Sequence, residues 1–452
     1  MNFKKFFSII LITIFVQSFS KKIIFPFKTK TYPFDPEKEF KYILKNEIYT
    51  TLYVGTPSQK VELYLTTRTP FFIIKKNETF ENYFKSDASS TYVPHNENNT
   101  FYLSDEVLKH GIHSSEKIYL QNSFEEQSLS QIDNLDFIYC TQYKKDSKYH
   151  QGILGLQYFS TYYVYPREIN IMVLLKKRGL TSNYVWNLNY TSDDSGYLVI
   201  GEYPHTYDEK NYNKENIRYA NLYNKSNYEY ILNFDDIYIT LNNQNFYLEK
   251  NKIASFYIEE FFIFGTNEYF EQIEYLFFKK YINEQICHKK VHKYKNIMYY
   301  FICYINDNKV REIFFNNFPS LTFYQKQMNY NFTLDSKDLF TIIPDNNRIL
   351  FNIGFINNSK IWILGKPFFK KYQISFNIKS NKIIYYSNSS LNVKEIKNNE
   401  ISKKLYFIIF FVFISGFLLG KIICFKYNRK IRANELEDNY SYLSNNTNNI
   451  NN

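Results

Sequence analysis

The sequence predicts a fold built mainly of β-strands, with room for two lobes. The chain has 452 residues, which is long enough to form two lobes with sizeable hydrophobic cores. Aromatic residues make up 20% of the chain and only 12 residues are glycine, so bulky strand formers are abundant and flexible turns are scarce. Residues 61–74 read as an apolar strand, a short polar loop and a second apolar strand. A helix is predicted over residues 169–179, because apolar residues recur there at helical spacing and Gly179 follows a basic last turn.

The formal net charge of +11 does not indicate a nucleic-acid partner. Lysine and arginine are spread along the whole chain, and no basic block alternates with aromatic residues over a stretch that would form a nucleic-acid surface. We therefore interpret the charge as a solvated background and expect no nucleic acid among the partners.

The two ends of the chain predict a type I membrane protein. Residues 1–20 have the basic start, apolar middle and small-residue exit of a secretory signal peptide. Leu405 to Phe425 is almost wholly apolar and about long enough to cross a bilayer, and basic residues follow it as they do on cytoplasmic flanks. We predict an ectodomain in the secretory lumen or at the cell surface, a stalk at residues 391–404 and a cytoplasmic tail at residues 426–452.

Several stretches carry a family resemblance. Gly55-Thr56-Pro57-Ser58-Gln59 precedes the first apolar strand, Gln151-Gly152-Ile153-Leu154-Gly155-Leu156 follows later, and Ile361-Trp362-Ile363-Leu364-Gly365 lies near the end of the ectodomain. In these motifs the chain resembles the pepsin-like aspartic proteases, in particular their plasmepsin-like, membrane-anchored members. The resemblance implies an all-β, bilobed pepsin-like acid protease fold and an interlobe cleft that takes a protein or peptide ligand. It also implies a short N-terminal pro-like segment at residues 21–40, an N-terminal lobe at residues 41–205 and a C-terminal lobe at residues 206–390.

The resemblance is weakest where the family does its chemistry. Each lobe of a pepsin-like enzyme supplies an Asp-Thr-Gly motif, and the two carboxylates hold a water and share one proton. The aligned residues here are Thr66-Thr67-Arg68 in the first lobe and Tyr257-Ile258-Glu259 in the second. Neither the Thr66 nor the Tyr257 hydroxyl ionises at acid or neutral pH, so neither can replace a carboxylate. We predict that both catalytic aspartates are replaced and that the protein is a pseudoprotease without a catalytic residue.

Four further residues are candidates for the cleft. Arg68 stands where the family has glycine and adds bulk and a cation. Ser104 takes the position of the tyrosine in the family's flap. Glu259 and Glu260 could each offer a carboxylate, but a single carboxylate lacks the partner that a dyad requires. We therefore expect these two glutamates to be solvated or to cap a helix.

Other residues that could carry chemistry have structural interpretations. Asp194-Ser195-Gly196 is the one near match to the catalytic motif, and we interpret it as a turn because it leads directly into a predicted strand. His110 with His113, and His288 with His292, are isolated pairs that we expect in surface loops. The sequence therefore predicts neither a metal site nor a cofactor.

The four cysteines fit an oxidising compartment without a disulfide-rich fold. Cys287 and Cys303 lie close in the sequence and precede a predicted strand, so we predict a disulfide between them. We interpret Cys140 as a buried small apolar residue. Seven Asn-x-Ser/Thr sequons in the predicted ectodomain indicate a glycoprotein: Asn77, Asn98, Asn189, Asn224, Asn331, Asn357 and Asn388.

Three functional hypotheses follow from this reading. The first is a receptor or scaffold subunit that binds a protein or peptide in the interlobe cleft without cutting it. The second is an aspartic-type endopeptidase with a non-standard active site, using Glu259 or Glu260. The third is a structural or adhesion component of the surface whose cleft is closed. An open cleft favours the first two hypotheses, and a cleft filled by Arg68, Tyr257 and aromatic side chains favours the third.

Protease added to sealed vesicles or cells is expected to leave an epitope in residues 426–452 intact, because the bilayer separates this tail from the ectodomain. The ectodomain should be digested wherever it faces the medium. Immunoblots against both regions measure the result, and detergent-permeabilised membranes, in which both epitopes should disappear, are the control. A tail digested from the same side as the ectodomain would contradict the type I topology.

Overall fold

The structure is a computed structural model of the whole chain. It describes residues 22–30, 47–76, 83–102, 107–121, 129–143, 151–157, 170–223, 229–294, 296–343, 348–356 and 359–387. The predicted signal peptide, the apolar segment 405–425 and Ser104 lie outside these residues. Among the helices in the described residues, none combines the length and apolar character that a membrane span requires.

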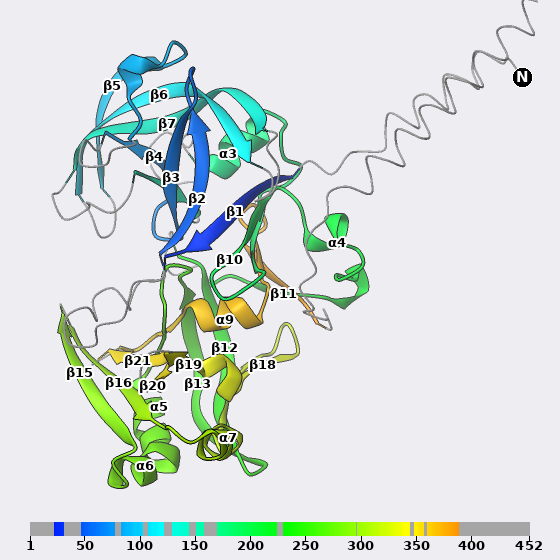
Figure 1. Ribbon diagram of the computed structural model, residues 1–452. Coiled ribbons are helices and arrows are strands. Elements are labelled where there is room, and N and C mark those ends of the chain that lie inside the picture. The colour runs from blue at the N-terminus through cyan, green and yellow to red at the C-terminus, as the bar shows by residue number, and fades with distance from the viewer. Residues whose placement is uncertain are drawn as a thin grey trace, which may run out of the picture. The chain divides into compact units, whose positions relative to one another are not determined.

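The strands of the described residues form two large sheets, and the first has 13 strands (Figure 1). Its order is β11-β24-β23-β9-β10-β1-β2-β3-β8-β4-β7-β6-β5. The bounds are β1 (Ile23–Thr29), β2 (Ile48–Val54), β3 (Gln59–Thr66), β4 (Phe72–Lys75), β5 (Val93–Tyr102), β6 (Val107–Gln121), β7 (Leu129–Tyr143), β8 (Gly152–Gly155), β9 (Val185–Tyr190), β10 (Ser195–Ile200), β11 (Ile217–Asn221), β23 (Ser375–Asn377) and β24 (Lys382–Tyr386).

The second sheet has 11 strands within the described residues, in the order β18-β17-β12-β13-β22-β14-β21-β16-β20-β19, with β15 paired to β16. The bounds are β12 (Ile231–Leu241), β13 (Gln244–Phe256), β14 (Ile263–Gly265), β15 (Cys287–Tyr294), β16 (Asn296–Tyr304), β17 (Ser320–Gln325), β18 (Tyr330–Leu334), β19 (Phe340–Ile343), β20 (Arg348–Phe351), β21 (Ile353–Ile356) and β22 (Trp362–Leu364). The two sheets give the mostly β, two-lobed architecture that the sequence predicts.

Short helices connect the strands. The α-helices are α3 (Ile171–Lys177), α4 (Pro204–Tyr207), α5 (Asn267–Ile273), α6 (Lys279–Asn283), α7 (Asn308–Asn316), α8 (Ser336–Leu339) and α9 (Lys366–Lys371). The 3₁₀ turns are η1 (Ser86–Ala88) and η3 (Lys214–Asn216), and η4 (Glu274–Phe278) is a π-helical turn between α5 and α6. The predicted helix over residues 169–179 is confirmed as α3: Asn170 caps its start, and Gly179 follows its end with a φ of 66°.

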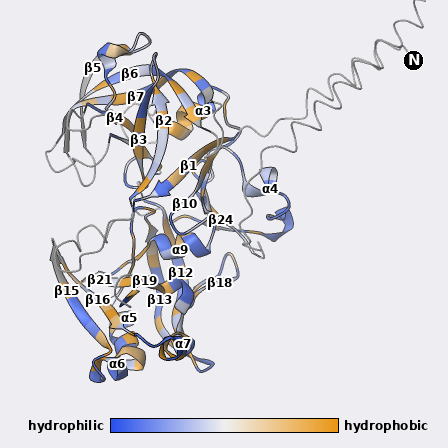
Figure 2. Cartoon of the chain, in the orientation of Figure 1, coloured by the Kyte–Doolittle hydropathy of each residue, from blue (hydrophilic) through white to orange (hydrophobic). Residues whose placement is uncertain are grey.

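Strand β1 lies within the stretch that we expected to be a pro-like segment. It pairs with β10 from Ile23 to Lys28 and with β2 from Phe27 to Thr29, so both of its edges are hydrogen-bonded. Its side chains are largely buried, and Figure 2 shows hydrophobic colouring along it. Because both of its edges are hydrogen-bonded and most of its side chains are buried, this part of residues 21–40 is an integral strand of the sheet.

The two lobes share one aromatic core. Trp186 on β9 stacks on Phe376 of β23 with ring centroids 4.5 Å apart, and its Nε1 donates to the Tyr230 hydroxyl at 2.9 Å. The same hydroxyl donates to the Leu156 carbonyl of the first lobe. The buried hydrophobic cluster around these residues is continuous across both lobes. Trp186 and Tyr230 are tolerated in it because their polar atoms have hydrogen-bond partners.

Asparagine fills most of the left-handed backbone positions outside glycine. Within the described residues, the non-glycine residues with positive φ are Asn134, Asn242, Asn243, Asn251, Gln285, Asn329 and Asn381. Asn242 and Asn243 form the two-residue turn between β12 and β13, where both central residues of a type I′ turn need positive φ. The scarcity of glycine is therefore no obstacle to tight hairpins.

The predicted disulfide between Cys287 and Cys303 is confirmed, and it joins directly opposite residues of β15 and β16. Cys140 is buried in β7, as expected. The sequons differ in accessibility. Asn331 is exposed on β18, whereas Asn189 is buried in β9 with its side-chain amide 3.5 Å from the Tyr207 hydroxyl. Asn189 is therefore closed to a glycan in the folded protein, contrary to the expectation from its sequon.

Two glycines let the chain pass closely beneath the loops at the lobe boundary. A Cβ atom on Gly155 would lie 2.2 Å from the Thr69 carbonyl oxygen and 2.7 Å from the Phe71 nitrogen. In the second lobe, a Cβ atom on Gly365 would lie 2.2 Å from the Phe262 carbonyl oxygen. Backbone atoms cannot move aside as a flexible side chain can, so both crossings require glycine.

Gly155→Ala is expected to lower the free energy of unfolding by about 1–3 kcal/mol, because the added methyl group overlaps backbone atoms of the loop after β3. Denaturant unfolding followed by circular dichroism measures the change. Gly179→Asn is the matched control: no atom lies within 4 Å of a Cβ at that position, and asparagine tolerates its positive φ. Equal unfolding midpoints for Gly155→Ala and the wild-type protein would contradict the close crossing.

Candidate functional site

The loops that follow β3 and β13 occupy equivalent places in the two lobes. Thr66 lies opposite Gly155 in the parallel β3–β8 pair. In the parallel β13–β22 pair Phe256 lies opposite Leu364, so the same register carried one residue further sets Tyr257 opposite Gly365. The Thr67 hydroxyl oxygen lies 3.2 Å from the Phe256 carbonyl oxygen, which brings the two loops into contact. Thr66 and Tyr257 are therefore structurally equivalent positions that meet at the lobe boundary.

The Glu259 carboxylate is buried against the loop of the opposite lobe. Its Oε1 accepts a hydrogen bond from the Thr66 hydroxyl at 3.0 Å and lies 3.0 Å from Arg68 Nε. Its Oε2 accepts from the Thr67 hydroxyl at 2.9 Å and from the Thr67 backbone nitrogen at 3.2 Å. The side chain is only 5% exposed. Three hydrogen-bond contacts and one ion pair therefore surround the two oxygens of this buried carboxylate.

The Arg68 guanidinium lies between two acidic groups and an aromatic ring. It forms ion pairs with Glu259 and Glu260. Its Cζ lies 4.7 Å from the centre of the Tyr257 ring, which is a cation–π distance. Its backbone nitrogen donates to the Thr66 hydroxyl at 3.1 Å, which fixes the start of the loop. The Arg68 side chain is 29% exposed, so it reaches the surface, while the carboxylates of Glu259 and Glu260 neutralise its charge.

Two tyrosines beside this cluster stay neutral. Burial raises the pKa of Tyr257, and a hydrogen bond with Glu229 raises it further, while the charge of Arg68 opposes these effects. Burial likewise raises the pKa of Tyr64 well above its usual value, and the negative charge of Glu259 adds to this. A phenol whose pKa is raised above 10 keeps its proton at acid and neutral pH. Neither tyrosine can therefore serve as a base.

The structure corrects the expectation that Glu259 is solvated or caps a helix. The carboxylate is buried and bound by the first lobe, and Glu260 is ion-paired to Arg68 with its side chain 14% exposed. Sequence reasoning missed this contact, although it contained the signal for it. Arg68 and Glu259 each stand two residues after the equivalent positions Thr66 and Tyr257, so opposite charges occupy matched places in the two lobes.

The histidine pairs also differ from expectation. His110 and His113 lie in β6, and His288 and His292 lie in β15, so all four are strand residues rather than loop residues. The interpretation of Asp194-Ser195-Gly196 as a turn is compatible with the structure, because backbone hydrogen bonds to the Ser195 carbonyl close the bend that leads into β10.

A family model described as eukaryotic aspartyl protease matches residues 47–386, from the residue before β2 to the last residue of β24. The matched region contains both central loops and implies a cleft that binds peptides. No curated protein matches the chain.

A double-mutant cycle tests the ion pair across the lobe boundary. Arg68→Met and Glu259→Gln are expected to show a coupling free energy of about 1–3 kcal/mol in unfolding experiments, because Arg68→Met leaves the buried Glu259 carboxylate without its counter-charge and Glu259→Gln leaves Arg68 with Glu260 alone. The same substitutions at Lys60 and Glu62, an exposed pair 3.8 Å apart with side chains 55% and 46% exposed, form the matched control. There we expect less than about 0.5 kcal/mol. Equal coupling at the two pairs would show that the cluster does not hold the lobes together.

Proposed function

The chain belongs to the eukaryotic aspartyl protease family, and from this premise we propose that it is an aspartic pseudoprotease that binds a peptide or protein segment without hydrolysing it. In this proposal Thr66 and Tyr257 stand in place of the two catalytic aspartates. The binding region is the cleft between the lobes, and Arg68, Glu259 and Glu260 lie at its centre. The biological role is that of a receptor or scaffold subunit.

The observation that carries the proposal is the enclosure of the Glu259 carboxylate by groups of the opposite lobe. A general base needs a free lone pair directed at the water that it activates. Both oxygens of Glu259 already accept or pair with groups of Thr66, Thr67 and Arg68. Glu260 is paired with the same guanidinium. This arrangement supports a non-hydrolytic centre and argues against an endopeptidase that uses either glutamate.

The disulfide and the sequence both support a location in the secretory pathway. The bond between Cys287 and Cys303 fits the secretory pathway, since structural disulfides persist in oxidising compartments. We further propose that residues 405–425 anchor the ectodomain in a secretory or cell-surface membrane, with lobes at residues 41–205 and 206–390. The apolar length of this segment and the basic residues after it support the anchor.

A second candidate function is favoured by the position of Arg68. Its guanidinium lies over the Tyr257 ring at 4.7 Å and is paired on its other sides, so side chains already fill the centre between the loops. A filled centre favours a structural or adhesion component of the surface. The two candidates differ in one property, because only the binding protein retains peptides in its cleft.

Full-length protein in detergent is expected to cleave no member of a broad peptide library from acid to neutral pH. Restoring hydrolysis should require Thr66→Asp and Tyr257→Asp, which supply the two carboxylates. It should also require Arg68→Gly and Glu259→Gly together, because removing one charge of this pair leaves the other without its partner. Mass spectrometry of the peptides measures cleavage. The matched control carries Asn instead of Asp at positions 66 and 257, and it should stay inactive.

The same library separates the two candidates. If the protein is a binding subunit, intact peptides should remain bound to the immobilised wild-type chain after washing. If the chain retains none, the structural role is favoured. Turnover by the wild-type protein that survives Glu259→Gln and Glu260→Gln would overturn both, because it would require carboxylates outside the cluster described above.

A further inference from the structure

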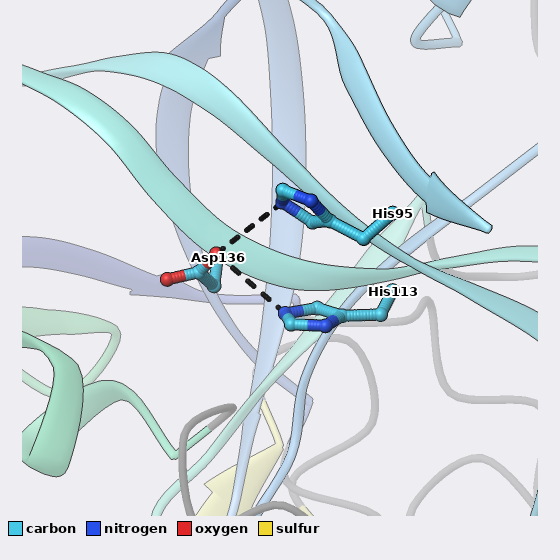
Figure 3. Close-up of side chains that lie close together, drawn as sticks. All are labelled: His95, His113 and Asp136. Carbon is cyan, nitrogen blue, oxygen red and sulfur yellow. Dashed lines mark ion pairs between the residues drawn. The ribbon is translucent and has the colours of Figure 1, made fainter. Parts of the chain in front are cut away.

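Three strands of the first lobe bring two imidazoles and a carboxylate together (Figure 3). In the β6–β7 pair Ser115 lies opposite Asp136 and His113 lies opposite Ile138, so His113 and Asp136 are diagonal neighbours on one face. In the β5–β6 pair Pro94 lies opposite Ser114, and His95 is the next residue, at the start of an irregular stretch of pairing. The irregular stretch begins where His95 turns toward β7.

Two of the donor-atom separations are close to those of a tetrahedral metal site. Asp136 Oδ1 lies 3.5 Å from His113 Nε2 and 3.7 Å from His95 Nε2, and the candidate ligand atoms all lie within 4.8 Å of one another. Ligands at about 2.0–2.1 Å from a tetrahedral zinc ion are about 3.3–3.4 Å apart. The His95 side chain is 38% exposed, so it has room to rotate and close the longest separation.

The second oxygen of the Asp136 carboxylate contacts Arg178. Asp136 Oδ2 lies 3.6 Å from Arg178 Nη2. Arg178 is itself fixed by donating to the backbone carbonyls of Asp133 and Asn134. This contact keeps Oδ1 directed at the two imidazoles, which is the role that outer hydrogen-bond partners have around metal ligands. His95 Nε2 also lies 3.1 Å from the Ser115 hydroxyl, a contact that a bound metal would replace.

We propose that His95, His113 and Asp136 bind one divalent transition-metal ion of the zinc class. Two imidazole nitrogens and one carboxylate oxygen are the donor types that zinc selects, and a water would complete a four-coordinate site. The ion ties β5 and β6 to β7. It thereby fixes the base of the β5–β6 hairpin to the rest of the lobe. The proposal is independent of the function of the lobe boundary, because it shares no residue with that cluster.

The test uses the full-length chain in detergent, stripped with a chelator and titrated with Co²⁺ while visible absorption is recorded. We expect one equivalent of Co²⁺ with the strong bands of a four-coordinate ion, displaced by Zn²⁺, and a Zn²⁺-dependent rise in the thermal unfolding midpoint. His113→Ala and Asp136→Asn should each lose the bands and the rise. His288→Ala, which removes an exposed histidine on β15, should keep both.

A folding defect can be distinguished from loss of a ligand. Circular dichroism of each stripped variant reports the fold, and His95→Gln changes the most exposed ligand with the least effect on packing. If His113→Ala does not fold, loss of the Co²⁺ bands in folded His95→Gln supports the site. Absence of saturable Co²⁺ binding by the wild-type chain would overturn the proposal. Bands of unchanged strength in His95→Gln and Asp136→Asn would also overturn it, because they would place the metal elsewhere.

Discussion

The Arg68–Glu259 ion pair is the interaction on which the centre of this protein depends. Each lobe contributes one of the two charges, and the threonine loop of the first lobe supplies the remaining donors to the buried carboxylate. A charge so far removed from water is stable only while its partners stay in place. Any ligand that enters between the loops must therefore replace these contacts with equivalent ones. In our proposal, this ion pair between the lobes stands at the place where enzymes of the family hold a reactive water.

The chain separates two roles that glycine usually combines. Where the backbone needs only a positive φ, asparagine often takes the position, as Asn242 and Asn243 do between β12 and β13. Where a Cβ atom would collide with a carbonyl oxygen, glycine is kept, as at Gly155 and Gly365. Asparagine can adopt a positive φ in place of glycine, but only glycine lacks the Cβ atom that would collide. The 12 glycines are thus enough for a large β fold.

The sequence predicted the architecture better than the site. The helix that ends before Gly179 follows local rules of capping, so its place could be read from the residues themselves, whereas the motif around Gly155 was recognised by its resemblance to the family. The burial of Glu259 could not, because its partner Arg68 is 191 positions away in the sequence and only the folded lobes bring them together. His95 and Asp136 were missed for a related reason. Their meeting depends on an irregular pairing of β5 with β6, which no periodic pattern predicts.

The sheet that runs through the lobe boundary has a consequence for synthesis of the chain. Strand β9 completes its pairing only with β23, whose residues are translated nearly two hundred positions later. Until then the nascent first lobe presents an uncovered row of amide and carbonyl groups beside the exposed Trp186 indole, which is a template for association with other chains. The interval between these two strands is therefore a period in which the nascent chain can associate with other chains through this edge. A fragment that ends before β23 would carry the same open edge permanently.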